Sequence, residues 1–191
     1  MINPVSYEIN KQNLFQICDI LERSNIEYTV FYGTMLGIHR DGKIIESDDD
    51  VDVLVKVSDF MKVLFAIKSS GLVISKNVDK MFLQVRNTIN DIKSYVDIYF
   101  YYDSGYNYII EPWNFLGRYM DKENHLHIPY NLVFPVKTFN YDGKLIKIPS
   151  ESEQLCKFLY GENYRLPMRK KIDYTTKIVN NKPEIIYHQT L

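Results

Sequence analysis

Acidic side chains crowd into one short stretch of this chain, Glu46-Ser-Asp-Asp-Asp-Val-Asp-Val-Leu-Val55. Aspartate is a poor strand residue and like charges repel, so such a run leading into an apolar strand is costly unless a cation takes up the charge. Residues two apart in a strand face the same side. Asp50 and Asp52 therefore point one way, while Val51 and Val53 point into a core. The pattern predicts a metal site at the mouth of a sheet.

A third carboxylate lies in Tyr95-Val-Asp97-Ile-Tyr-Phe100, inside a strong strand pattern. A charge in a buried strand is expensive unless it is paired or bound to metal. Alone, Asp97 fits an edge strand or a solvent face equally well. Together with the upstream cluster, it favours a metal site. Carboxylate oxygens suit Mg²⁺, and metal ions held in this way serve phosphoryl transfer. A calcium loop is excluded because Val53 stands where such a loop needs glycine.

Gly33-Thr-Met-Leu-Gly37 lies a short way upstream of the aspartates. Glycine lets the backbone approach a phosphate closely, and the amides at a helix start face an anion. A short helix beginning at Thr34 would therefore bring Gly33 and Thr34 against the phosphates of a substrate.

The rest of the pattern describes the elements that position these residues. Helices are predicted near 10–24, from an N-cap at Ser58 to Gly71, and from the capping box Ser150-Glu-Ser-Glu153 to Tyr160. Strands are predicted at 28–32, 51–57, 72–75, 81–86 and 94–102, with a hairpin over 139–148 that turns at Asp142-Gly143. This order predicts a mixed α/β sheet flanked by helices.

One domain is expected over residues 1–191. It divides into a core of about 10–102, a C-terminal hairpin-helix extension of about 103–175, and a polar, loosely held tail of 176–191.

Composition narrows the class of protein. The net charge of −1 gives no general attraction to nucleic acid, so no nucleic-acid partner is expected. No run of 18 apolar residues and no apolar leader is present, which predicts a cytoplasmic protein without a transmembrane segment. Cys18 and Cys156 lie at apolar positions and are interpreted as buried hydrophobes.

The motifs together resemble the LicD and fukutin-related family of the nucleotidyltransferase fold. The resemblance rests on Gly33-Thr-Met-Leu-Gly-Ile-His-Arg40 followed by Asp48-Asp-Asp-Val-Asp52. It extends to Val96-Asp97-Ile98, Phe134-Pro135, the Asp142-Gly143 hairpin, Ile148-Pro149 and Leu159-Tyr-Gly161, and covers roughly residues 28–167. The chain departs from the family at Glu46-Ser47, where an aromatic residue and a proline are usual, and 103–131 has no counterpart.

The resemblance implies a metal-dependent transferase. It would move a phospho-alcohol group, such as phosphocholine or ribitol phosphate, from a CDP-activated donor to a hydroxyl of a sugar, glycan or glycolipid, and release CMP. Such a reaction suits modification of a cell-surface polysaccharide. Asp50, Asp52 and Asp97 would be catalytic and hold Mg²⁺ or Mn²⁺, and Asp97 would also serve as the base for the acceptor hydroxyl.

The resemblance also assigns the donor-binding residues, which would be Gly33, Thr34, Gly37 and Arg40. Arg40 would offset phosphate charge. Its alternative is a surface ion pair with Asp41 or with an aspartate of the cluster. His39 is interpreted as incidental.

Two other functions fit the same residues. The first is nucleotidyl transfer, in which an NTP adds NMP to a small molecule, protein or RNA and pyrophosphate is released. The second is a non-catalytic protein that binds a nucleotide or a partner. The presence of all three carboxylates weighs against the second, because such a protein is expected to have lost a metal ligand.

Overall fold

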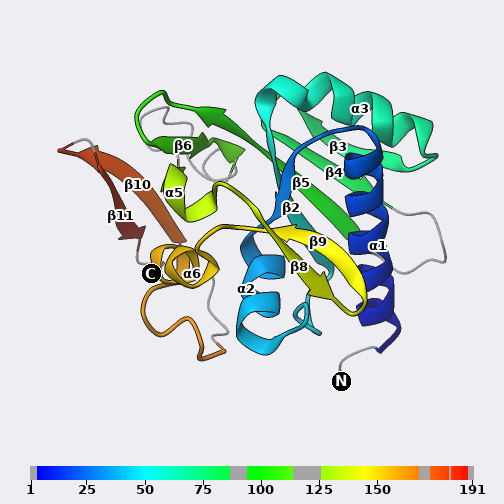
Figure 1. Cartoon of the computed structure of the whole chain (residues 1–191), viewed down its shortest axis with the longest axis horizontal. Helices are drawn as coiled ribbons and strands as arrows, with labels where there is room; N and C mark the ends of the chain where they lie inside the picture. Colours follow the sequence, from blue (N-terminus) through cyan, green and yellow to red (C-terminus); the bar gives the residue numbers. More distant parts are fainter. Residues whose placement is uncertain (1–3, 87–93, 114–125, 168–172, 181, 189–191) are drawn as a thin grey trace.

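The computed structural model describes residues 4–86, 94–113, 126–167, 173–180 and 182–188 (Figure 1). In this part of the chain, a mixed seven-stranded sheet has the strand order β1-β2-β5-β4-β3, and β6 joins β5 to β7. These strands are β1 (Tyr28–Val30), β2 (Asp50–Lys56), β3 (Val73–Val78), β4 (Phe82–Arg86), β5 (Tyr95–Asp103), β6 (Tyr108–Glu111) and β7 (Leu126–Pro129). The predicted mixed α/β sheet is confirmed.

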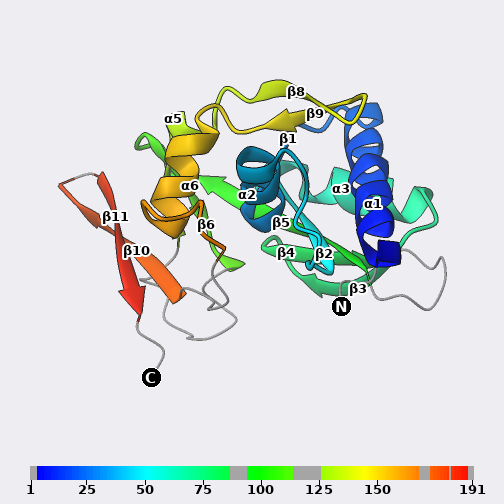
Figure 2. The same ribbon diagram turned by 90° about the horizontal axis from the view of Figure 1, so that it is seen from below.

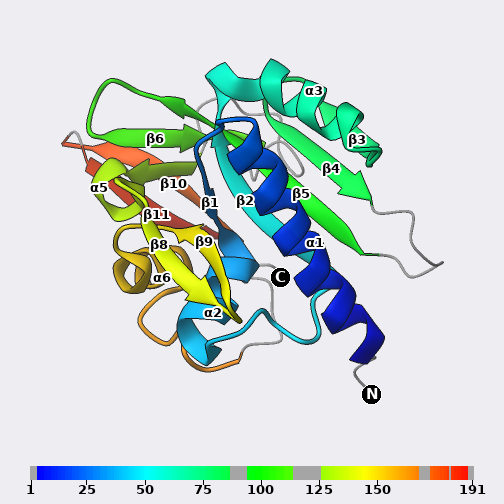
Figure 3. The same ribbon diagram turned by 45° about the vertical axis from the view of Figure 1, so that its right-hand side comes forward.

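The helices within the described residues are α1 (Pro4–Arg23), α2 (Tyr32–Asp41), α3 (Phe60–Ser69), α5 (Tyr130–Val133) and α6 (Ser152–Tyr160). Helices α1 and α3 lie on one side of the sheet in Figure 2, and α1 lies along β2 and β5 in Figure 3. No helix in the described part of the chain is long and apolar enough to cross a membrane.

The core lies between these two helices and the central strands. From β2, Val51, Val53 and Val55 are fully buried, and from α1 the stripe Leu14, Ile17, Cys18 and Leu21 is fully buried as well. Phe60 of α3 packs edge-on against Phe100 of β5, with ring centroids 5.0 Å apart. Because side chains alternate along a strand, the residues between these apolar ones face the other side of the sheet.

Strand pairing determines which residues meet on that other side. Strand β2 runs parallel to β5, with Asp52 opposite Asp97. Strand β5 runs antiparallel to β4, with Asp97 opposite Gln84, and Gln84 is in turn opposite Lys76 of β3. Residues directly opposite one another in neighbouring strands share a face. A polar row therefore crosses the sheet from Asp52 to Lys76.

Two helices begin earlier than predicted, α1 at Pro4 and α2 at Tyr32, and two predicted N-caps are wrong. Ser58 does not cap a helix, because Val57–Asp59 form a 3₁₀ turn and α3 begins only at Phe60. The capping box at Ser150 does not form either, since Glu151 is the N-cap of α6 and makes no side-chain cap bond. The Ser150 amide instead donates to the carbonyl of Val133 at 2.9 Å, so a tertiary contact with α5 replaces the local one.

Two hairpins complete the described structure. The first pairs β8 (Lys137–Tyr141) with β9 (Lys144–Ile148) and turns at Asp142-Gly143, both with positive φ, as predicted. The second pairs β10 (Asp173–Val179) with β11 (Lys182–His188) (Figure 1), and both of its strands contact β7. The tail predicted for 176–191 thus forms strands over the part of it that the structure describes. The β-branched residues of β10, such as Thr175, Thr176 and Ile178, favour a strand.

Candidate active site

Three carboxylates converge where β2 and β5 begin. Asp50 is the first residue of β2, and Asp52 and Asp97 are partners in the parallel pairing. One carboxylate oxygen from each residue lies within 4.8 Å of one from each of the others. Asp52 and Asp97 are only 5% and 7% exposed. The structure therefore brings together the three residues that the sequence predicted as a metal site.

Crowding and burial raise the pKa of all three carboxyl groups. Burial, and next the Asp48 carboxylate, raises the pKa of Asp50 to about 8. Burial, and next the Asp50 carboxylate, raises the pKa of Asp52 well above its usual value. Burial raises the pKa of Asp97 to about 6, although a hydrogen bond from Gln84 acts in the opposite direction. Two buried acids and one half-buried acid, all with oxygen donors, fit a hard divalent cation, which would relieve the repulsion.

The start of α2 contacts Asp52 directly. The Asp52 amide donates to Thr34 Oγ1 at 2.8 Å, and the Thr34 amide donates to Asp52 Oδ2 at 3.3 Å. A Cβ at Gly33 would lie 2.9 Å from Asp48 Oδ2 and 3.3 Å from Asp52 Oδ2. The absence of a side chain at Gly33 thus keeps space open beside the carboxylates. Thr34 holds Asp52 through two hydrogen bonds, a role that sequence analysis missed.

The loop before β2 is held by a buried polar network that sequence analysis also missed. Asn10 Nδ2 donates to the Asp48 carbonyl at 2.7 Å, and Ser94 Oγ donates to Asn10 Oδ1. Asn13 Nδ2 donates to Ser94 Oγ at 2.7 Å, and the Tyr95 amide bonds to the Asp49 carbonyl at 3.0 Å. Asn10 and Asn13 continue the apolar stripe of α1 at helical spacing. Polar residues at core positions were therefore the available signal.

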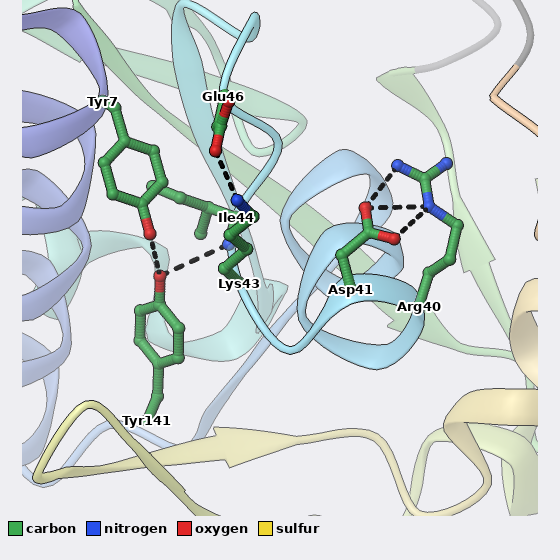
Figure 4. Close-up of polar contacts among 7 residues, drawn as sticks. All are labelled: Tyr7, Arg40, Asp41, Lys43, Ile44, Glu46 and Tyr141. Carbon is green, nitrogen blue, oxygen red and sulfur yellow. Dashed lines mark hydrogen bonds and ion pairs between the residues drawn. The ribbon is translucent and has the colours of Figure 1, made fainter. Parts of the chain in front are cut away.

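Gly37 and Arg40 lie further along α2. A Cβ at Gly37 would come within 2.7 Å of the Lys43 carbonyl oxygen and 2.8 Å of the Ile45 amide nitrogen, so this glycine allows close packing of the returning chain. Figure 4 shows Arg40 bonded to Asp41, with Nη2 to Oδ2 at 2.7 Å. This is the ion pair considered as the alternative for Arg40. The predicted contacts of Arg40 and Gly37 with phosphate stay predictions.

Figure 4 also shows how the loop after α2 is fixed. The Ile44 amide donates to the Tyr141 hydroxyl at 3.3 Å, and that hydroxyl is 3.2 Å from the Tyr7 hydroxyl. Lys43 and Glu46 form an ion pair. Contacts from α1 and from the β8–β9 hairpin therefore support the loop that leads to the aspartates.

His39 of α2 is not at the carboxylates. Its Nε2 lies 3.1 Å from the Tyr164 hydroxyl, which joins α2 to the chain after α6. Burial lowers the pKa of His39.

A cluster of aromatic rings lies next to the carboxylates on the same face of the sheet. Tyr99, two residues after Asp97, packs edge-on against Tyr32 at 4.8 Å between centroids. It also contacts Phe82, which stacks on Trp113 at 4.6 Å and an interplanar angle of 11°. The Lys76 ammonium lies 4.3 Å from the centroid of Trp113. A packed aromatic cluster, with the Lys76 ammonium over the Trp113 ring, thus borders the acids on this face.

Comparison with known proteins matches this chain to one domain family. The family described as LicD/FKTN/FKRP, nucleotidyltransferase domain, matches residues 25–151. No curated protein matches the sequence.

Among solved structures, the lincosamide antibiotic adenylyltransferase LnuA with bound lincomycin is similar, with a TM-score of 0.55 and 19% identity over 82% of this chain and 89% of that one. The antibiotic-resistance factor ANT(2'')-Ia gives a TM-score of 0.49 and 11% identity over 85% and 78%. The likeness to LnuA supports a nucleotidyltransferase fold.

Proposed function

Because this chain belongs to the LicD/FKTN/FKRP family of nucleotidyltransferase domains and is therefore a transferase, we propose that it transfers a phospho-alcohol group from a CDP-activated donor to a hydroxyl acceptor. The transferred group would be phosphocholine or ribitol phosphate, and the acceptor would be a hydroxyl of a glycan or glycolipid. The observation that carries the proposal is the trio of carboxylates, two of them buried, beside the start of a helix; one oxygen from each lies within 4.8 Å of one from each of the others.

Asp50, Asp52 and Asp97 would hold the divalent cation, Mg²⁺ or Mn²⁺. Their burial and mutual repulsion support this assignment, since unpaired buried charge is costly. When bound, the metal would neutralise charge on the donor diphosphate.

Gly33 and Thr34 would receive the donor phosphates. Helix α2 spans ten residues, and its N-cap residue Phe31 makes no side-chain cap bond. The Thr34 amide already donates to Asp52, so the Gly33 amide and the helix dipole would favour an anion there. Thr34 Oγ1 accepts from the Asp52 amide and keeps its own proton for donation. Thr34 would thereby connect the phosphates to a metal-binding carboxylate, while Gly33 keeps the approach open.

Asp97 would serve the acceptor. Asp52 lies between the start of α2 and Asp97. If the donor phosphates bind at α2, the attacking hydroxyl would approach from the side of Asp97. In the proposed step, the acceptor oxygen bonds to the phosphorus next to the alcohol as its proton moves to an Asp97 oxygen. The bond from that phosphorus to the bridging oxygen breaks, and CMP leaves with the bonding pair. This arrangement suits in-line displacement, in which positioning supplies most of the rate gain.

A thermal-shift panel tests the donor class without knowledge of the acceptor. The protein with Mg²⁺ or Mn²⁺ is mixed with CDP-choline, CDP-ribitol, CDP-glycerol, CMP and the four NTPs. A ligand at about 100 times its Kd adds roughly 2.7 kcal/mol, or about 5–11 °C at about 2–4 °C per kcal/mol for this chain length. We expect a CDP-alcohol to stabilise the protein more than CMP does, and only when the metal is present. The Asp52→Asn variant should not show this stabilisation. Preference for an NTP would favour nucleotidyl transfer, and no response would favour a non-catalytic protein.

A further inference from the structure

Gln84 of β4 is the neighbour of Asp97 on the side away from Asp52. Its Nε2 donates to Asp97 Oδ1 at 3.1 Å, across the antiparallel pair in which the two residues are directly opposite. Asp97 is 7% exposed, so the orientation of its carboxylate depends on protein contacts. A donor that engages Oδ1 fixes the rotation of the carboxylate and leaves Oδ2 for other partners.

Ser75 of β3 in turn holds Gln84. Its hydroxyl lies 3.2 Å from Gln84 Oε1 and 3.1 Å from the Gln84 carbonyl, so its single proton serves two acceptors of the same residue. A donor at Oε1 orients the amide so that its NH₂ group faces Asp97. Without that donor, the amide oxygen could turn toward the carboxylate and repel it.

An irregularity in β3 places Ser75 there. The register between β3 and β4 shifts between Ile74 and Lys76, and Lys76 takes the position opposite Gln84. Ser75 is thus the extra residue of a bulge. Bulges next to functional sites commonly redirect a side chain. Here the bulge lets Ser75 reach Gln84 while Lys76 keeps its place in the polar row.

We propose that Gln84, oriented by Ser75, is a positioning residue that fixes Asp97 so that Oδ2 faces the metal and the acceptor hydroxyl. This inference rests on the proposed function, in which Asp97 is a metal ligand. Contacts behind a metal ligand orient it and typically contribute 10–100-fold to metal affinity or activity.

The test measures Mn²⁺ affinity by electron paramagnetic resonance, without nucleotide, so that it does not depend on activity. Gln84→Met keeps the length of the side chain and removes its donor. It is expected to weaken Mn²⁺ binding about tenfold, with a melting temperature in EDTA within a few degrees of wild type. Ser75→Ala removes only the contact behind Gln84 and is expected to weaken binding about threefold, the share of one hydrogen bond. Asn77→Ala, an exposed change in the same strand, should leave the affinity unchanged.

Asp97→Asn separates failure of this inference from failure of the proposed function. If Asp97→Asn weakens Mn²⁺ binding but both Gln84→Met and Ser75→Ala bind as wild type does, the positioning role is wrong and the metal site stands. If Asp97→Asn itself binds normally, the assignment of Asp97 is wrong, and with it both proposals. Should Gln84→Met fail to fold, Ser75→Ala alone decides, because its hydroxyl lies on an exposed edge residue.

Discussion

Replacing Asp97 with asparagine is expected to stabilise the metal-free protein at high pH. The carboxyl group is buried, and burial raises its pKa to about 6. Asparagine has nearly the same shape, carries no charge, and keeps an Oδ1 that can accept the bond from Gln84 Nε2. The substitution therefore removes the charge with little change in packing or in this hydrogen bond.

The sign and size of the effect follow from the pKa. A carboxyl group whose pKa is higher in the folded than in the unfolded protein loses its proton less readily when folded, so its ionisation opposes folding. The rise from 3.8 to about 6 for Asp97 is about 2 units, and at about 1.36 kcal/mol per unit the ionised group costs about 3 kcal/mol. This cost is absent below pH 3.8, grows between pH 3.8 and about 6, and is complete above that window.

The assay compares wild type with Asp97→Asn in EDTA at pH 4 and pH 8. At pH 8 the variant should melt roughly 6–12 °C higher, and at pH 4 the difference should nearly vanish. Asp79→Asn, an exposed change near the same sheet, should stay within about 0.5 kcal/mol at both pH values. Mn²⁺ at about 100 times its wild-type Kd should stabilise wild type by about 2.7 kcal/mol and the variant by less, and so narrow the gap. A variant no more stable than wild type at pH 8, or equally stabilised at pH 4, would refute the reasoning.

Three further predictions concern α2. In Gly33→Ala, the new Cβ would lie 2.9 Å from a side-chain oxygen of Asp48. The fold should persist, whereas stabilisation by Mn²⁺ with a CDP-alcohol should be lost in a thermal-shift assay. In Gly37→Ala, the Cβ would lie 2.7 Å from the Lys43 backbone oxygen, which cannot move aside as a side chain can. Urea melts should show a loss of about 1–3 kcal/mol. Burial lowers the pKa of His39, so the stability it contributes is present above pH 6.5 and lost as pH falls. NMR titration should place the His39 midpoint below 6.5, and a midpoint above it would contradict this placement.

Local pattern was enough to predict the centre of the site. The alternation of residues in β2 predicted that Asp50 and Asp52 share a face, and the apolar pattern around Asp97 predicted that it lies within a strand. These inferences need only the two-residue period of a strand and the cost of buried charge. The hairpin at Asp142-Gly143 was predictable for a similar reason, because a tight turn with two positive φ angles favours this residue pair.

The supporting contacts were not predictable, because they depend on which strands pair and in what register. Gln84 meets Asp97 only because β4 lies antiparallel to β5. Ser75 reaches Gln84 only through an irregular pairing of β3. Asn10 reaches the Asp48 carbonyl from a helix that is remote in the sequence. A helix-cap pattern can also be overruled by tertiary contacts, as when the Ser150 amide bonds to the Val133 carbonyl.

The two buried carboxylates of the row are held from opposite sides by different means. Asp52 receives an amide proton from Thr34 at the start of α2, and Asp97 receives an amide proton from Gln84 in β4. Each donor stabilises the ionised form of its carboxylate, which is the form that binds a metal. Strand pairing alone would place both acids on one face but would leave the rotation of each carboxylate undefined. Metal binding should therefore depend on the contact from α2 and on the contact from β4. Local sequence patterns do not reveal the contact from β4, so changes in β4, distant from the aspartate motif, should alter metal affinity.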